Sequence, residues 1–218
     1  MPVASFENVE AVVHTIALTS VDNEKYFGDL DAVVGDGDFG YSLARGFEIV
    51  LADWGSLEYE DIGGLLKRTA VILTKRIGGT SGPIWGTAFL RAGASLAGVG
   101  DPDSAQVIAA MRAAIEGIKQ RGDCELGDKT LLEALVPAVD ALEEALGAGL
   151  DVGSALERAA ASARAGAEQT KGMLAKRGRA SYTGDRSRDS VDAGAVGVAV
   201  IFEAISHEWQ QSAMKLEA

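Results

Sequence analysis

Cysteine and proline are scarce in this chain of 218 residues. Its one cysteine, Cys124, excludes an internal disulfide and suits a reducing cytosol. With only four prolines, few helices are interrupted. The first residues contain no basic segment followed by an apolar one, and no apolar run approaches the length of a membrane span. We therefore expect a cytoplasmic protein that is not inserted in a membrane.

Basic residues are also in the minority. Twenty Lys and Arg residues stand against 32 Asp and Glu residues, which gives a formal net charge of −12. Such an acidic chain is a poor non-specific ligand for nucleic acid or an anionic membrane, although a local site can still bind phosphate. With 47% hydrophobic residues and no linker-like stretch, residues 1–218 are expected to form a single domain.

The hydrophobic pattern predicts helices almost throughout. Ala, Leu and Glu dominate, apolar residues recur at three- and four-residue steps, and there is no hairpin signal. The alanine-rich stretch 155–166 requires closely packed neighbours. The predicted fold class is therefore all-α, an antiparallel helical bundle or barrel of about eight helices. The expected helices are 7–19, 22–34, 41–54, 58–76, 83–98, 103–120, 129–147, 151–176 and 193–211.

The densest cluster of acids and glycines lies in residues 30–42, which contain Asp31, Asp36 and Asp38. Asp31 falls in the last turn of an expected helix, and glycines let the following loop fold back, so the three carboxylates can converge. Three like charges repel unless a hard cation lies between them, and Mg²⁺ accepts such oxygen ligands. Because another helix begins after Asp38, the loop predicts a metal and phosphate site.

Three other interpretations of this loop compete. Its glycines spell G-x-G-x-x-G, superficially the dinucleotide fingerprint, but that loop keeps carboxylates away from the pyrophosphate and belongs to strand-rich chains. An EF-hand starting at Asp36 would need a glycine at Tyr41 and a glutamate at Phe47. A solvated acidic turn is the third interpretation, because Asp and Gly are common turn residues.

Two further stretches suit phosphate groups. In residues 76–87 a helix ends in a glycine pair, and Thr80 and Ser81 precede the next helix. Their hydroxyls and free backbone N–H groups suit a phosphate, while the simpler alternative is that they cap the helix. Residues 176–188 contain five basic residues and one acid, which indicates either an arm that closes over phosphates or a solvated loop. Asp192, which follows, is a candidate N-cap.

Four motifs together resemble the nucleotide-binding L subunit family of dihydroxyacetone kinases. They occur in the family's order and cover nearly the whole chain. The resemblance implies an all-helical barrel with ADP or ATP bound at one end through two Mg²⁺ ions. The motifs are Gly35-Asp36-Gly37-Asp38-x-Gly40, Gly79-Thr80-Ser81-Gly82-Pro83 with Gly86-Thr87, Gly127-Asp128-Lys129-Thr130, and Gly178-Arg179-Ala180-Ser181-Tyr182 with Asp192-x-Gly194-Ala195.

The resemblance also implies roles for single residues, although it assigns no catalytic residue to this chain. Asp31, Asp36 and Asp38 match the metal ligands of the family. Leu131 is expected to form an apolar wall for the base. Two positions depart from the family pattern, with Phe39 in place of a polar residue or cysteine and Ala193 in place of proline. The positions that match nucleotide contacts are Phe39, Gly40, Tyr41, Ser42, Thr80, Ser81, Gly122, Leu131, Arg179, Asp192, Ala193 and Gly194.

The reaction that the resemblance implies is phosphoryl transfer to a hydroxyl of a short ketose. In the family a histidine of a separate K subunit or domain holds the ketose. His14 and His207 of this chain stand in no motif and are expected to be structural, so a K-subunit partner is required. In one branch a phosphotransferase-system protein recharges the nucleotide, and in the other ATP exchanges freely. The resemblance is also compatible with a homodimer.

A different class of function also fits these motifs. The chain could sense nucleotide state and regulate a partner such as a transcription factor without turnover. Retention of all three aspartates together with Arg179 favours the kinase subunit, because a sensor does not need the geometry of phosphoryl transfer. The sequence does not identify the phosphoryl donor or the ketose.

Overall fold

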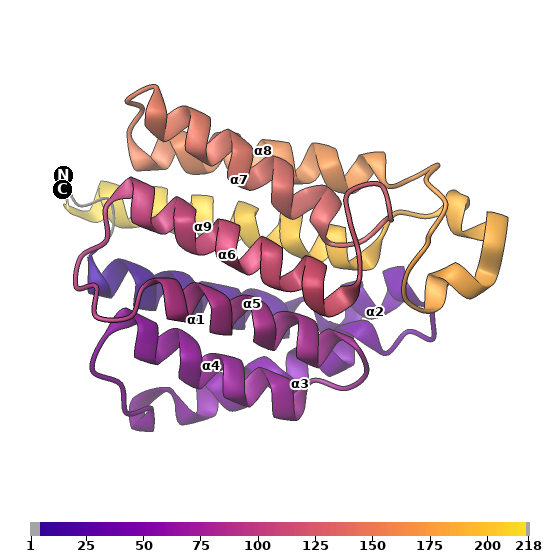
Figure 1. Ribbon diagram of the computed structural model, residues 1–218, viewed down its shortest axis with the longest axis horizontal. Coiled ribbons are helices and arrows are strands. Elements are labelled where there is room, and N and C mark those ends of the chain that lie inside the picture. Colours follow the sequence, from indigo (N-terminus) through magenta and orange to yellow (C-terminus); the bar gives the residue numbers. More distant parts are fainter. Residues whose placement is uncertain (1–4, 217–218) are drawn as a thin grey trace.

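The computed structural model describes residues 5–216, and within that range every regular element is a helix (Figure 1). The prediction of an all-α fold is therefore confirmed. The elements are α1 (Phe6–Asp22), α2 (Glu24–Asp31), α3 (Phe39–Asp53), η1 (Trp54–Ser56), α4 (Ile62–Arg76), α5 (Ser81–Ser95), α6 (Ser104–Gly122), α7 (Leu132–Gly147), α8 (Val152–Gln169), η2 (Arg179–Asp189) and α9 (Ala193–Leu216), where η marks a 3₁₀ helix.

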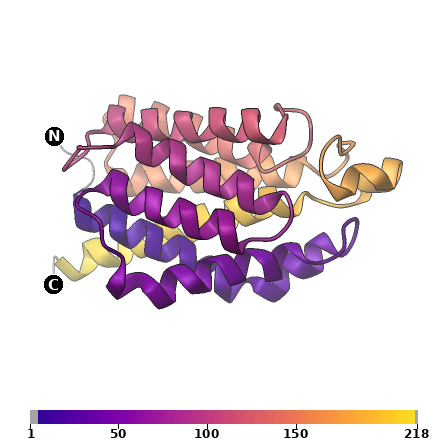
Figure 2. The ribbon, with the colours of Figure 1, turned by 60° about the horizontal axis from the view of Figure 1, so that its bottom comes forward.

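The long helices close into a ring. Helix α1 packs against α3, each helix from α3 to α8 packs against the next, and α9 returns to α1. Short α2 lies at one end of the ring beside α3. Figures 1 and 2 show the long helices running side by side along the longest axis. This ring is the predicted helical barrel.

Helix α8 packs closely against its neighbours because it contributes small side chains to the core. Ala155, Ala159, Ala163 and Ala167 are fully buried. A Cβ atom at Gly166 would lie 2.1 Å from the carbonyl oxygen of Glu133, so α7 and α8 approach more closely there than larger residues would allow.

In the described part of the chain no single helix has the length and hydropathy expected of a membrane span. Only η2 and α9 taken together, with a bend of 78° between them, meet these two criteria.

Several helix boundaries differ from the expected ones, and two of these differences lie beside the acidic loop and η2. The helix expected at 22–34 spans Glu24–Asp31, and the chain after it forms a turn that reaches Gly37, which has a φ of +76°. The helix expected at 151–176 ends at Gln169, since a glycine three residues later has a φ of +91°. Both corrections lengthen loops at one end of the barrel. The residues that follow the second helix form η2, which the sequence pattern did not predict.

Four connections gather at the end of the barrel opposite the termini (Figure 1). They join α2 to α3, α4 to α5, α6 to α7, and α8 to α9 through η2. Because neighbouring helices alternate in direction, these connections share one end although they lie far apart in sequence. All the residues proposed for the site belong to these connections or to the helix turns beside them.

Candidate metal and phosphate site

The acidic loop between α2 and α3 is held by its first aspartate. The Asp31 carboxylate accepts hydrogen bonds from the N–H groups of Gly37 at 2.9 Å and Phe39 at 3.4 Å. A Cβ atom at Gly35 would lie 2.2 Å from the Asp31 carboxylate, and Gly37 has a φ of +76°. These two positions therefore require glycine for the loop to fold over Asp31.

The structure brings the three predicted carboxylates together. Asp31, Asp36 and Asp38 each offer an oxygen, and these oxygens all lie within 4.8 Å of one another. Asp31 is half-buried, whereas Asp36 and Asp38 are exposed. Asp38 immediately precedes α3, and its side chain does not cap that helix. Three carboxylates at this spacing form a hard donor set that fits Mg²⁺.

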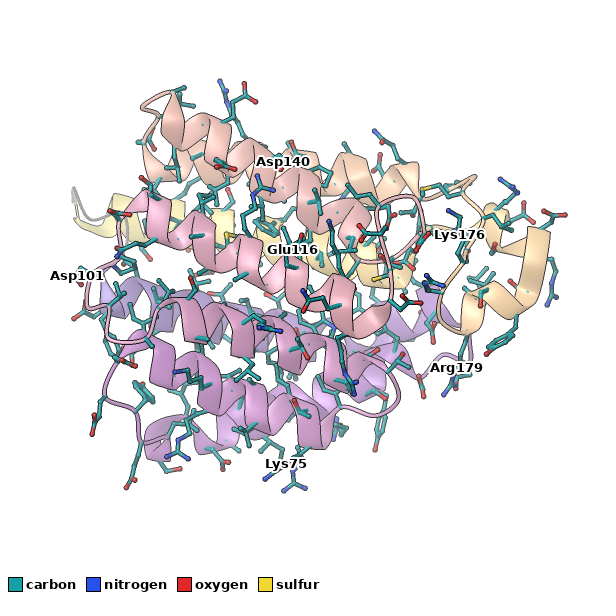
Figure 3. All side chains as sticks on the ribbon, viewed as in Figure 1. Lys75, Asp101, Glu116, Asp140, Lys176 and Arg179 are labelled. Carbon is teal, nitrogen blue, oxygen red and sulfur yellow. The ribbon has the colours of Figure 1, made fainter. Side chains whose placement is uncertain are left out.

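Arg179, at the start of η2, lies on the same carboxylates. Its guanidinium contacts Asp36, and its Nη2 atom is 3.5 Å from Oδ2 of Asp38. Figure 3 labels Arg179 at this end of the barrel. The sequence associated Arg179 with phosphates, but in the structure its partners are carboxylates. A metal ion and the guanidinium would compete for these oxygens.

The turn between α4 and α5 lies beside the first turn of α3. A Cβ atom at Gly78 would be 3.3 Å from the Ser42 hydroxyl oxygen. Thr80 stands at the cap position of α5, but its side chain makes no capping hydrogen bond, and Ser81 is the first helical residue. The simpler alternative, that these hydroxyls serve as helix caps, is therefore not borne out for Thr80. Two helix N-termini with hydroxyl side chains meet here, which favours an anion.

The start of α9 faces the start of α7. A Cβ atom at Gly194 would lie 3.5 Å from the Leu131 Cβ atom, so the predicted apolar wall borders this turn. The Asp192 carboxylate accepts the Ala195 N–H at 2.7 Å, which confirms the predicted N-cap. The Asp192 residue is partly exposed, but the surrounding protein desolvates its carboxylate. This burial raises the pKa of Asp192 to about 7, although the hydrogen bond from Ala195 opposes the shift. Ala193, the residue between Asp192 and Gly194, is half-buried.

The first residues of α3 serve both the site and the core. The Phe39 ring packs 6.1 Å from the Phe27 ring, between centroids, and 3.6 Å from a Cβ position at Gly197 of α9. A Cβ atom at Gly40 would lie 1.9 Å from a carbonyl oxygen of α2, so the two helices touch at this point. Tyr41 is exposed, with the Arg45 guanidinium 5.1 Å from its ring centroid. Phe39, where the resemblance implies a polar residue or cysteine, thus makes a core contact.

Two groups of predicted residues lie further from the carboxylates. Gly122 ends α6, and a Cβ atom there would be 3.6 Å from Ile84 of α5, so it borders the α5 turn. His14 and His207 line a groove with Trp54, and none of the three aspartates lines it. The His14 ring meets the Trp54 ring edge-on at 5.2 Å. His14 thus packs against a ring as expected, whereas the His207 side chain is 65% exposed, so its structural role stays a prediction.

The sequence assigned no role to Lys129 or Glu133. Lys129 is buried, with a φ of +62°, in the connection between α6 and α7. Glu133, in the first turn of α7, accepts hydrogen bonds from the N–H groups of Gly127 at 2.8 Å and Thr130 at 2.5 Å. Thr130-x-x-Glu133 has the spacing of a capping box, so this signal was present in the sequence.

The sequence is similar to a known domain family and to several kinases. Residues 33–207 match the DAK2 domain model. The chain is 35% identical over 182 residues to the "PEP-dependent dihydroxyacetone kinase, ADP-binding subunit DhaL" of Escherichia coli, which covers 84% of this chain and 87% of that protein. It is 37% identical to the L-erythrulose kinase of Pectobacterium atrosepticum over 84% of this chain but 32% of that protein.

A solved structure shares the fold. The dihydroxyacetone kinase of C. freundii in complex with AMP-PNP and Mg²⁺ matches with a TM-score of 0.74 and 26% sequence identity. The match covers 95% of this chain and 35% of that one, so the chain spans about a third of that kinase, as it does of the erythrulose kinase. Because the domain model and the E. coli relative each cover most of the sequence, this chain belongs to the DAK2 domain family.

Proposed function

We propose that this chain is the nucleotide-binding, phosphoryl-transferring subunit of a dihydroxyacetone kinase or a closely related short-ketose kinase. The observation that carries this proposal is the convergence of three carboxylates beside two helix N-termini. The names of the relatives support it, since they include an ADP-binding dihydroxyacetone kinase subunit and erythrulose kinases.

In this proposal Asp31, Asp36 and Asp38 hold Mg²⁺, which neutralises charge between the terminal phosphates when bound. The resemblance implies two such ions. The residues after Asp38 and the Thr80–Ser81 turn offer N–H and hydroxyl groups to the phosphates, and Leu131 offers an apolar surface to the base. The remaining proposed contacts come from Gly122, Arg179 and the turn at 192–194.

The ketose must be held by another protein surface. The groove lined by His14 and His207 includes none of the three aspartates. We therefore propose a K subunit that binds the ketose as the partner. Some relatives are named PEP-dependent or PTS-dependent, which supports a phosphotransferase-system donor. The other donor, freely exchanging ATP, is what the family resemblance implies.

An assay of ketose phosphorylation tests this function. The purified chain is mixed with a purified K subunit, Mg²⁺, and dihydroxyacetone or erythrulose, with either ATP or phosphoenolpyruvate plus the phosphotransferase proteins as donor. We expect a ketose phosphate only when both subunits are present. Mg-ADP binding without transfer from either donor would instead favour the alternative, a nucleotide-sensing module that regulates a partner.

Magnesium and ADP together are expected to raise the melting temperature of the chain. They bind the folded site and not the unfolded chain, and at 100 times Kd this contributes about 2.7 kcal/mol, or roughly 5–10 °C. Scanning calorimetry with ADP in Mg²⁺ and in EDTA makes the comparison. Equal melting temperatures in both would argue against a formed site.

A further inference from the structure

Lys129 is a buried cation bound entirely by main-chain oxygens. Its side chain and backbone are 2% exposed, and its ammonium group donates to the carbonyl oxygens of Met173 at 3.3 Å, Ser190 at 2.7 Å, and Ser187. Burial lowers the pKa of Lys129, against the influence of the nearby Asp192 carboxylate. A buried ammonium is tolerated only when its donors are satisfied, so these three contacts define its position.

The three carbonyl groups belong to both ends of one loop. Met173 precedes η2, while Ser187 and Ser190 lie at its end, so a single ammonium ties the two stems of the loop together. Further contacts close the same stems. The Ala175 N–H donates to the Ser187 hydroxyl at 3.0 Å, and the Lys176 N–H donates to the carbonyl oxygen before Lys129 at 3.0 Å.

The backbone of Lys129 is bound to the first turn of α7. The N–H of Lys129 donates to the Glu133 carboxylate at 3.2 Å, and Glu133 is itself buried in the first turn of α7. Two residues beyond Lys129, Leu131 faces Gly194 at the start of α9. Lys129 therefore connects α7 with the loop whose far side carries Arg179. Figure 3 shows this loop extending beyond the barrel, with Arg179 and Lys176 labelled on it.

We infer that Lys129 is the positioning residue that holds the loop 173–190 so that Arg179 faces the carboxylates of Asp36 and Asp38. In the described part of the chain its ammonium group donates to three main-chain carbonyl oxygens and to none of the proposed nucleotide contacts, so its proposed action is through Arg179. The effect on nucleotide affinity rests on the proposed function, whereas the anchoring of the loop does not.

Limited chymotrypsin digestion tests the anchoring without any ligand. Tyr182 lies on η2 and is 90% exposed. The rate of cleavage after it therefore depends on how often the backbone around it opens, and a looser loop is cleaved faster. We expect Lys129→Met, which keeps the length of the side chain but removes the donors, to raise this cleavage rate by at least about tenfold. Lys171→Met, an exposed lysine at the same stem, is the matched control and should change it little. Unchanged cleavage in Lys129→Met would overturn the inference.

A double-mutant cycle tests the functional part. With Mg²⁺ present, Lys129→Met should weaken ADP binding by about tenfold and should add little to the loss in Arg179→Ala, because both changes remove the same contact. Fully additive losses, or unaltered ADP affinity in a chain whose loop is cleaved faster, would show a purely structural lysine and contradict the inference. A wild-type chain that binds no Mg-ADP would overturn the proposed function, while digestion would still decide the anchoring.

Lys129→Gln is a second variant for the case in which Lys129→Met does not fold. Its amide retains two N–H donors without a charge, so it should fold even where methionine does not. We expect cleavage after Tyr182 at a rate between those of the wild type and Lys129→Met. Circular dichroism and the melting temperature report on the fold of each variant. A folded Lys129→Gln chain with wild-type cleavage and wild-type ADP affinity would also contradict the inference.

Discussion

Replacing Asp36 or Asp38 by asparagine is expected to abolish magnesium-dependent ADP binding. Both side chains point their oxygens at the common centre with Asp31, and removing one leaves the cation under-neutralised. Loss of even an outer partner of a metal ligand weakens binding by about 10- to 100-fold, so loss of a ligand should exceed that range. Calorimetric titration of ADP in Mg²⁺ and in EDTA measures the effect.

Asp36 and Asp38 are better targets than Asp31 because Asp31 also holds the loop through Gly37 and Phe39. Asp29→Asn is the matched control, since this carboxylate lies two residues before Asp31 and pairs only with Lys25, at 2.6 Å on the exposed surface. It should bind Mg-ADP as the wild type does. Tight ADP binding in EDTA, or normal affinity in both loop variants, would exclude the metal site and favour a solvated acidic turn.

Arg179→Ala is expected to change the affinities for metal and nucleotide in opposite directions. Without nucleotide the guanidinium lies on Asp36 and near Asp38, so its removal frees the oxygens and should tighten Mg²⁺ binding. With nucleotide, loss of a charge-assisted contact to the phosphates should cost on the order of 2 kcal/mol, which weakens ADP by tens of fold. Titrations with Mg²⁺ alone and with ADP at saturating Mg²⁺ separate the two effects.

The control for Arg179 comes from the same loop. Arg188 is unsuitable, because its Nη1 atom donates to the Gly172 carbonyl oxygen at 2.8 Å and helps to close the stem of the loop. Arg186 is exposed at the other end of η2, so Arg186→Ala should leave both affinities near those of the wild type. If Arg179→Ala and Arg186→Ala had equal, small effects, residues 176–188 would be a solvated surface loop.

Local sequence determined the helices and the acidic loop. The three- and four-residue apolar spacing depends only on neighbouring residues, and it predicted an all-α bundle or barrel; the structure confirms the all-α class and shows a closed ring. The spacing of Asp31, Asp36 and Asp38 around glycines likewise acts within one loop, so their convergence followed from the sequence. The N-cap role of Asp192 was predicted for the same reason, because a cap bonds a residue three positions away.

Contacts between distant segments were decided by the tertiary structure alone. The placement of Arg179 on the carboxylates joins residues more than 140 positions apart in the sequence, and the burial of Lys129 depends on carbonyl groups 44 to 61 positions away. No local spacing encodes such pairs, because loop directions are set by how the helices pack in the ring. The charged groups are therefore present in the sequence, but the alternation of helix directions brings their loops to one end of the barrel. There Arg179 contacts the carboxylates, and Lys129 donates to main-chain carbonyl oxygens.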